Sequence, residues 1–147
     1  MDTMNDIDVS AEIEIAAEPT DVASVMFDPA RAAEWVPAVK TVEVIDPAIR
    51  PGARVRYTGS FHGRDVAWTT EVAGFHFPHQ LIVSIADGPF TGKVHYSIVR
   101  AGSGSLARVR QVGDVAGLPA ALVTMHLQTA LNAGVARLKG LVEQGAT

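Results

Sequence analysis

The sequence contains no cysteine, which excludes disulfides, thiolate catalysis and cysteine-ligated zinc or iron–sulfur clusters. It also has no run of about 18 apolar residues, so a membrane-spanning helix is not expected. Basic residues are few: 12 lysines and arginines stand against 16 acidic residues, and the formal net charge is −4. Because nucleic acids and anionic lipid surfaces are bound by basic faces, this balance disfavours both as partners.

A secretory signal is missing too, since Met1 to Asp6 are polar and acidic and form neither a basic nor an apolar segment. We therefore expect a cytoplasmic, bacterial-type protein with residues 1–6 disordered. The chain of 147 residues is 48% hydrophobic and 19% charged, which suits a folded domain with a sizeable core. No repeat or linker divides it, so residues 7–145 are expected to form a single domain.

Hydrophobic periodicity predicts a strand and two short helices at the start of the domain. Apolar and polar residues alternate over residues 7–16, which is typical of a strand with one buried face. Two acid–proline pairs follow, Glu18-Pro19 and Asp28-Pro29, and proline is well tolerated in a first helical turn. Asp28 is the expected N-cap of the second helix, since aspartate is a favoured residue at that position. They predict one helix to about residue 27 and a second that ends before Pro37.

Between residues 39 and 113 the pattern changes to short strands separated by turns that contain glycine or proline. Short connections of this kind join antiparallel neighbours. We expect a four-residue hairpin connection at 62–65 and a glycine-rich one at 102–104. The predicted strands are residues 42–44, 53–61, 66–73, 81–85, 94–100 and 106–112.

Residues 119–143 contain no interior proline, and their apolar residues recur at spacings of three and four. This predicts an amphipathic helix of about seven turns, with a stripe made of Leu127, Leu131, Gly134, Leu138 and Leu141. A strongly twisted sheet curls, and only this helix is long enough to cover it. The sequence therefore predicts an α+β fold: a curved antiparallel seven-stranded sheet, two short helices after the first strand, and a long C-terminal helix across the concave face, with a space between them.

Several short motifs accompany this order of elements. They are Ile15-Ala16-Ala17-Glu18-Pro19, Pro37-Ala38-Val39-Lys40, Pro51-Gly52-Ala53-Arg54-Val55 and Gly104-Ser105-Leu106-Ala107-Arg108-Val109. Together they resemble the START-like superfamily, also called Bet v 1-like or SRPBCC, and within it bacterial members described as polyketide cyclase/dehydrase or lipid-transport proteins. The resemblance spans about residues 9–143 and implies a helix-grip fold that binds a hydrophobic ligand between sheet and helix. Some members cyclise or dehydrate aromatic polyketides and others carry or sense a ligand, with no shared catalytic signature.

Alternation along the strands assigns side chains to the predicted cavity. Arg54 and Arg56 share one face of their strand, and because burying two arginines is costly, the face of Tyr57 is expected to point inward. For residues 106–112 we take the face of Gln111 as the inward one. An apolar wall with a few polar tips is typical of a small-molecule site. The predicted ligand-binding residues are Trp35, Phe61, Trp68, Thr70, Phe90, Tyr96 and Met125.

Catalysis, if it occurs, would fall to Tyr57, His126 and Gln111. Cyclisation of a poly-β-ketone needs one group to take a proton and another to stabilise the enolate. His126 lies beside the apolar stripe of the last helix, where its imidazole is either a proton-transfer group or an ordinary helix-flank side chain.

No metal site or other cofactor is expected. A metal ion requires three or four convergent ligands, and the histidines show no such arrangement. We expect His62, His76 and His79 in loops or turns.

Three functions remain open at this point. The leading hypothesis is binding of a small hydrophobic molecule, aromatic or polycyclic, in the cavity. The second is a polyketide cyclase or dehydratase acting on a poly-β-ketone, ranked lower because few acids and bases are predicted to face inward. The third is a regulatory or protein-interaction module, whose mark would be an exposed apolar patch. The sequence does not decide whether the chain forms a homodimer.

Overall fold

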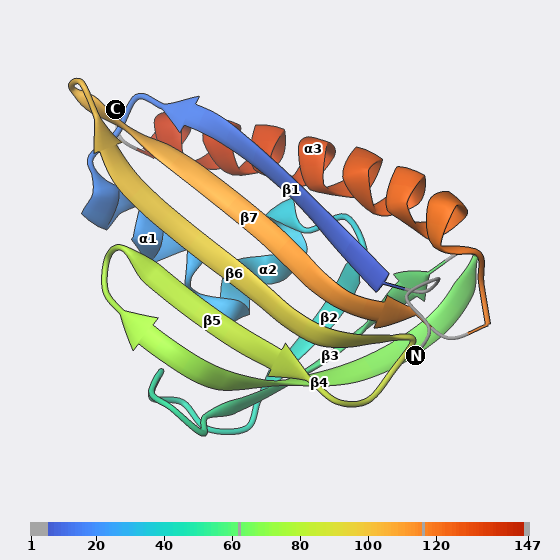
Figure 1. Cartoon of the computed structure of the whole chain (residues 1–147). Helices are drawn as coiled ribbons and strands as arrows, with labels where there is room; N and C mark the ends of the chain where they lie inside the picture. The colour runs from blue at the N-terminus through green and yellow to red at the C-terminus, as the bar shows by residue number, and fades with distance from the viewer. Residues whose placement is uncertain (1–5, 62, 116, 146–147) are drawn as a thin grey trace.

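The computed structural model describes residues 6–61, 63–115 and 117–145. β1 (Asp6–Ile15) is followed by α1 (Pro19–Met26), the short 3₁₀ helix η1 (Pro29–Arg31) and α2 (Ala32–Trp35). The remaining elements are β2 (Val39–Val44), β3 (Arg54–Phe61), β4 (Arg64–His76), β5 (Gln80–Ile85), β6 (Phe90–Ala101), β7 (Gly104–Val115) and α3 (Ala120–Gly145) (Figure 1). The prediction of disorder is wrong at Asp6, which begins β1 and pairs with Asp114. The predictions for residues 1–5 and for His62 lie outside the described residues.

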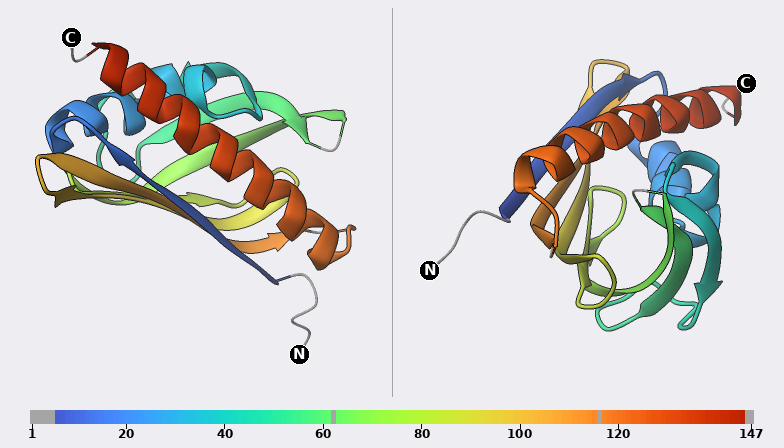
Figure 2. Two further views of the ribbon diagram at one scale, coloured as in Figure 1. Left: turned by 90° about the horizontal axis from the view of Figure 1, so that it is seen from above. Right: turned by 90° about the vertical axis from the view of Figure 1, so that its right-hand side faces the viewer.

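The seven strands form one antiparallel sheet in the order β1-β7-β6-β5-β4-β3-β2. β1 pairs with β7 from Asp6↔Asp114 to Ile15↔Ser105, so the first strand lies beside the last. Figure 2 shows the sheet curling, with α3 across its concave side and the short helices near one end. The predicted helix-grip fold is confirmed.

Both predicted hairpin connections are shorter than the sequence suggests. The β3–β4 pairing extends to Phe61↔Arg64 and the β6–β7 pairing to Ala101↔Gly104, so two residues join each pair of strands. Gly102 has a φ of 61°, which suits a two-residue turn. Backbone pairing continues through polar residues at the strand ends, which composition alone assigns to loops.

Side chains of α3 bind the exposed backbone of β1, which is an edge of the sheet. The Gln128 amide donates to the carbonyl oxygen of Ser10 at 2.8 Å. The Lys139 ammonium donates to the carbonyl oxygen of Glu14 at 3.0 Å, and the Glu143 carboxylate accepts from the N–H of Ala16 at 2.9 Å. These bonds hold the helix over one side of the sheet and satisfy backbone groups that lack a neighbouring strand.

The middle of α3 crosses close to α2 at Gly134. A Cβ at this position would lie 3.3 Å from the carbonyl oxygen of Trp35 and 3.5 Å from Cδ of Pro37. Gly140, further along the same helix, has nothing within 4 Å of such a Cβ. The close crossing therefore requires a small residue at 134 and determines how closely Trp35 packs against α3.

This crossing predicts different outcomes for two identical substitutions. Gly140→Ala should raise the free energy of unfolding by up to about 1 kcal/mol, because alanine favours the helix over glycine. Gly134→Ala gains the same helix propensity, but the new Cβ lies unusually close to the carbonyl oxygen of Trp35. This substitution should therefore leave the free energy of unfolding unchanged or lower it. Urea denaturation measures both variants, and equal stabilisation by the two would contradict the close approach.

Candidate functional site

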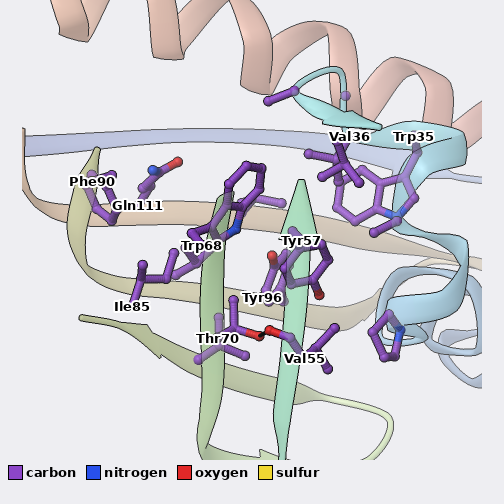
Figure 3. A pocket seen from close by; sticks show the side chains of 18 of the residues that line it. Trp35, Val36, Val55, Tyr57, Trp68, Thr70, Ile85, Phe90, Tyr96 and Gln111 are labelled. Carbon is purple, nitrogen blue, oxygen red and sulfur yellow. Dashed lines mark hydrogen bonds between the residues drawn. The ribbon is translucent and has the colours of Figure 1, made fainter. Parts of the chain in front are cut away.

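A cavity of about 200 Å³ lies between the concave face of the sheet, the α1–α2 region and α3. For comparison, an apolar cavity of about 150 Å³ suffices to bind benzene. The helix contributes Leu127, Ala130, Leu131 and Gly134 to the wall. Figure 3 shows the side chains that the strands and α2 direct toward this space.

Strand alternation supplies most of the wall, as the sequence predicts. Val55, Tyr57 and Phe61 of β3 face the cavity, and so do Val66, Trp68, Thr70 and Val72 of β4. Val94 and Tyr96 of β6 continue the same surface.

The inward face of β7 is the one that carries Gln111. Gln111 and Val109 line the cavity, and Val109 is 2% exposed. Arg110, on the other face, lies outside and donates to the carboxylate of Asp8 on β1 at 2.7 Å. An exposed salt bridge contributes little stability, so the register is set mainly by which residues can be buried.

Two aromatic pairs dominate the cavity. Tyr57 stacks on Trp68 with ring centroids 5.6 Å apart and an interplanar angle of 14°. Trp35 meets Tyr96 edge-on, with centroids 6.2 Å apart at 77°. The four rings come from α2, β3, β4 and β6, so the arrangement exists only in the folded chain (Figure 3).

Both phenols in the wall are kept protonated by their surroundings. Burial raises the pKa of Tyr57 to about 12, against the smaller lowering effect of a hydrogen bond with Thr70. Burial also raises the pKa of Tyr96, with a further contribution from Tyr57. A phenol of ordinary pKa is already uncharged near neutral pH, and burial extends this form to higher pH, so each hydroxyl can donate a hydrogen bond.

The structure adds two carboxylates, Asp28 and Asp46, that strand-face reasoning did not place in the cavity. Asp28 caps η1 by accepting from the N–H of Ala30 at 3.0 Å, and it contributes to the raised pKa of Tyr57. Asp46 accepts from the Arg54 backbone N–H at 2.9 Å and pairs with its guanidinium at 3.4 Å. The expectation of a wall nearly free of charge is wrong at these two positions. The Asp28-Pro29 signal predicts the cap but not its position beside the cavity.

Of the ten residues proposed from the sequence, eight line the cavity: Trp35, Tyr57, Phe61, Trp68, Thr70, Phe90, Tyr96 and Gln111. Their contact with a ligand stays a prediction. Met125 does not line it and is 70% exposed. The reason is helical geometry: Val123 and Leu127 are buried, and Met125 lies two residues, or about 200°, from each.

His126 is exposed on α3, outside the residues that line the cavity. Its ring is perpendicular to that of Phe61, with centroids 5.8 Å apart at 90°. The three predicted catalytic residues are therefore not brought together, because Tyr57 and Gln111 are inside and His126 is not.

The described residues contain no group of three or more histidine, cysteine, aspartate or glutamate side chains arranged to hold a metal ion. His76 lies at the end of β4 rather than in a loop, and its ring stacks on that of His79 at 6.3 Å. Among the described helices, none is long and apolar enough to cross a membrane.

Several solved structures share this fold. A START superfamily protein from Mycobacterium smegmatis has a TM-score of 0.80 at 22% identity, over 93% of this chain and 97% of the other. A protein from Thermus thermophilus has a TM-score of 0.80 at 18% identity, over 95% and 99%. The di-domain ARO/CYC BexL from the BE-7585A biosynthetic pathway has a TM-score of 0.72 at 17% identity, over 96% of this chain and 50% of that one.

These likenesses are distant in sequence and show the fold. No curated protein matches the chain. Residues 6–143, however, match the family described as polyketide cyclase/dehydrase and lipid transport. Since this match covers nearly the whole domain and the fold agrees with it, the chain belongs to this family.

Proposed function

We propose that the protein binds a small aromatic or polycyclic molecule in the cavity under α3. The observation that carries the proposal is the wall: a space of about 200 Å³ lined mostly by apolar and aromatic side chains. The family fold is one that holds hydrophobic ligands. The two aromatic pairs in the wall present both ring faces and ring edges, which suit a flat aromatic ligand. These pairs are Trp35 with Tyr96 and Tyr57 with Trp68.

The expected affinity is modest. Each buried CH₂-sized group contributes about 0.8 kcal/mol, and a ligand of one or two rings must offset the freedom lost on association. About ten such groups give about 8 kcal/mol, which corresponds to a micromolar dissociation constant before that cost is subtracted, so we expect a constant between about 1 μM and 1 mM.

Two alanines of α3 allow a matched test. Ala130 lines the cavity, whereas Ala133 is on the exposed side of the same helix. Ala130→Phe should fill part of the cavity and weaken binding by about tenfold or more, and Ala133→Phe should leave it unchanged. Quenching of tryptophan fluorescence by naphthalene derivatives, flavonoids and fatty acids measures this, because both tryptophans lie in the wall.

The proposal predicts saturable quenching by the aromatic compounds in the wild type. Absence of quenching by every compound in the panel would contradict it. Equal weakening in Ala130→Phe and Ala133→Phe would place the binding site outside the cavity.

A second candidate function is cyclisation of a poly-β-ketone, and the position of Asp28 favours it. Its carboxylate lies on the cavity wall and acts electrostatically on Tyr57. In an aldol step Asp28 would take a proton from a methylene between two carbonyls, and Tyr57 would donate a hydrogen bond to the enolate oxygen. The enolate carbon would bond to a second carbonyl carbon, whose oxygen would receive the proton as a hydroxyl.

Replacement of the Asp28 carboxylate tests this role. Asp28→Asn should keep the fold stable, since asparagine caps helices as well as aspartate does. Turnover of a poly-β-ketone thioester, followed by ultraviolet absorbance, should fall by about 100-fold or more. Asp114→Asn, at an exposed position of β7, should have no effect. Unchanged turnover in Asp28→Asn would remove the catalytic assignment.

A further inference from the structure

The indole N–H of Trp35 is a buried donor without an acceptor. Trp35 is 4% exposed, and its Nε1 has no hydrogen-bond partner among the described residues. Buried donors in folded proteins are nearly always paired, because leaving one unmade is unfavourable. Trp35 also lines the cavity, so an acceptor can come from a molecule bound there.

Two phenol donors, Tyr57 and Tyr96, line the same cavity. The centroid of the Tyr96 ring is 6.2 Å from that of Trp35, and Tyr57 is close enough to Tyr96 to contribute to its raised pKa. Trp35, Tyr57 and Tyr96, which we call the donor cluster, thus bring three donors to neighbouring positions on a mostly apolar wall.

The charge around the donor cluster disfavours an anion. Among the described residues that line the cavity there is no lysine, arginine or histidine, and the charged ones are Asp28 and Asp46. A carboxylate ligand would lose its hydration and meet negative charge without a cation to replace the water. An uncharged acceptor avoids this penalty.

We propose that the donor cluster recognises the carbonyl oxygen of an uncharged aromatic ligand and selects it over a carboxylate of the same shape. An indole N–H can only donate, so its partner must be an acceptor. A carbonyl oxygen has two lone pairs and can accept from Trp35 and from one phenol together. This inference rests on the proposed binding function and specifies its ligand class.

Three probes of equal heavy-atom count separate the effect of the carbonyl hydrogen bond from the effect of a negative charge. They are 2-acetylnaphthalene, 2-isopropylnaphthalene and 2-naphthoate. Isothermal titration calorimetry gives their dissociation constants for the wild type, Trp35→Phe and Trp68→Phe. The ratio of ketone to hydrocarbon affinity should fall about tenfold in Trp35→Phe and stay constant in Trp68→Phe. The smaller phenylalanine ring affects the binding of ketone and hydrocarbon alike, so its effect cancels in the ratio. A change in the ratio therefore reports the loss of the indole N–H. The naphthoate should bind the wild type at least about tenfold more weakly than the ketone.

A second measurement does not depend on the stability of Trp35→Phe. The chain has two tryptophans, so its ¹H–¹⁵N spectrum has two indole signals, and the one that remains in Trp68→Phe belongs to Trp35. The ketone should move the Trp35 indole proton downfield, as a new hydrogen bond does, and the hydrocarbon should not.

The outcomes separate this inference from the proposed function. If none of the three probes binds, binding of small aromatic molecules in the cavity is wrong. If ketone and hydrocarbon bind but the Trp35 signal responds equally to both, or the ratio is the same in all three proteins, the donor cluster does not recognise the carbonyl. Tighter binding of naphthoate than of the ketone would also overturn the inference.

Discussion

The hydrogen bonds between α3 and the edge strand β1 determine where the helix lies, and the cavity depends on that position. Gln128, Lys139 and Glu143 bind backbone groups of β1 and the residue after it at 2.8–3.0 Å. Held on this side, α3 turns Leu127 and Leu131 toward the cavity rather than packing them against the inward residues of β3 to β6. The same bonds protect a sheet edge that would otherwise present free backbone groups to other chains.

The cavity combines good packing around its wall with an unpaired donor inside it. Buried aromatic pairs contribute to stability beyond their area, whereas the Trp35 N–H has no acceptor among the described residues, and leaving such a buried bond unmade costs about 1–3 kcal/mol. A ligand that supplies the acceptor relieves this penalty when it binds. Selectivity would then come from pairing a donor that the fold leaves unpaired, together with the absence of cations among the described wall residues.

Sequence patterns predicted the cavity well where one simple period applies. The period of two along a strand, together with the cost of burying Arg54 and Arg56, was enough to place Tyr57 and its neighbours inside. The same reasoning failed on α3, where each residue turns the side chain by about 100° and proximity in sequence misplaced Met125 and His126. Asp28 was recognised as a helix cap, but a cap signal describes the local backbone and not what lies opposite it.

The order of the elements, the inward face of most strands and the family all follow from the amino-acid sequence alone, because they depend on periodicity and local motifs. Which polar groups share the cavity follows only from the packing of the folded chain. Asp28 and Trp35 come from the short helices after β1, Tyr57 comes from β3 and Tyr96 from β6, and the curl of the sheet and the close crossing at Gly134 bring these segments together. The polarity of the site is therefore a property of the packed fold, since a local sequence pattern does not predict how close α2 lies to β6.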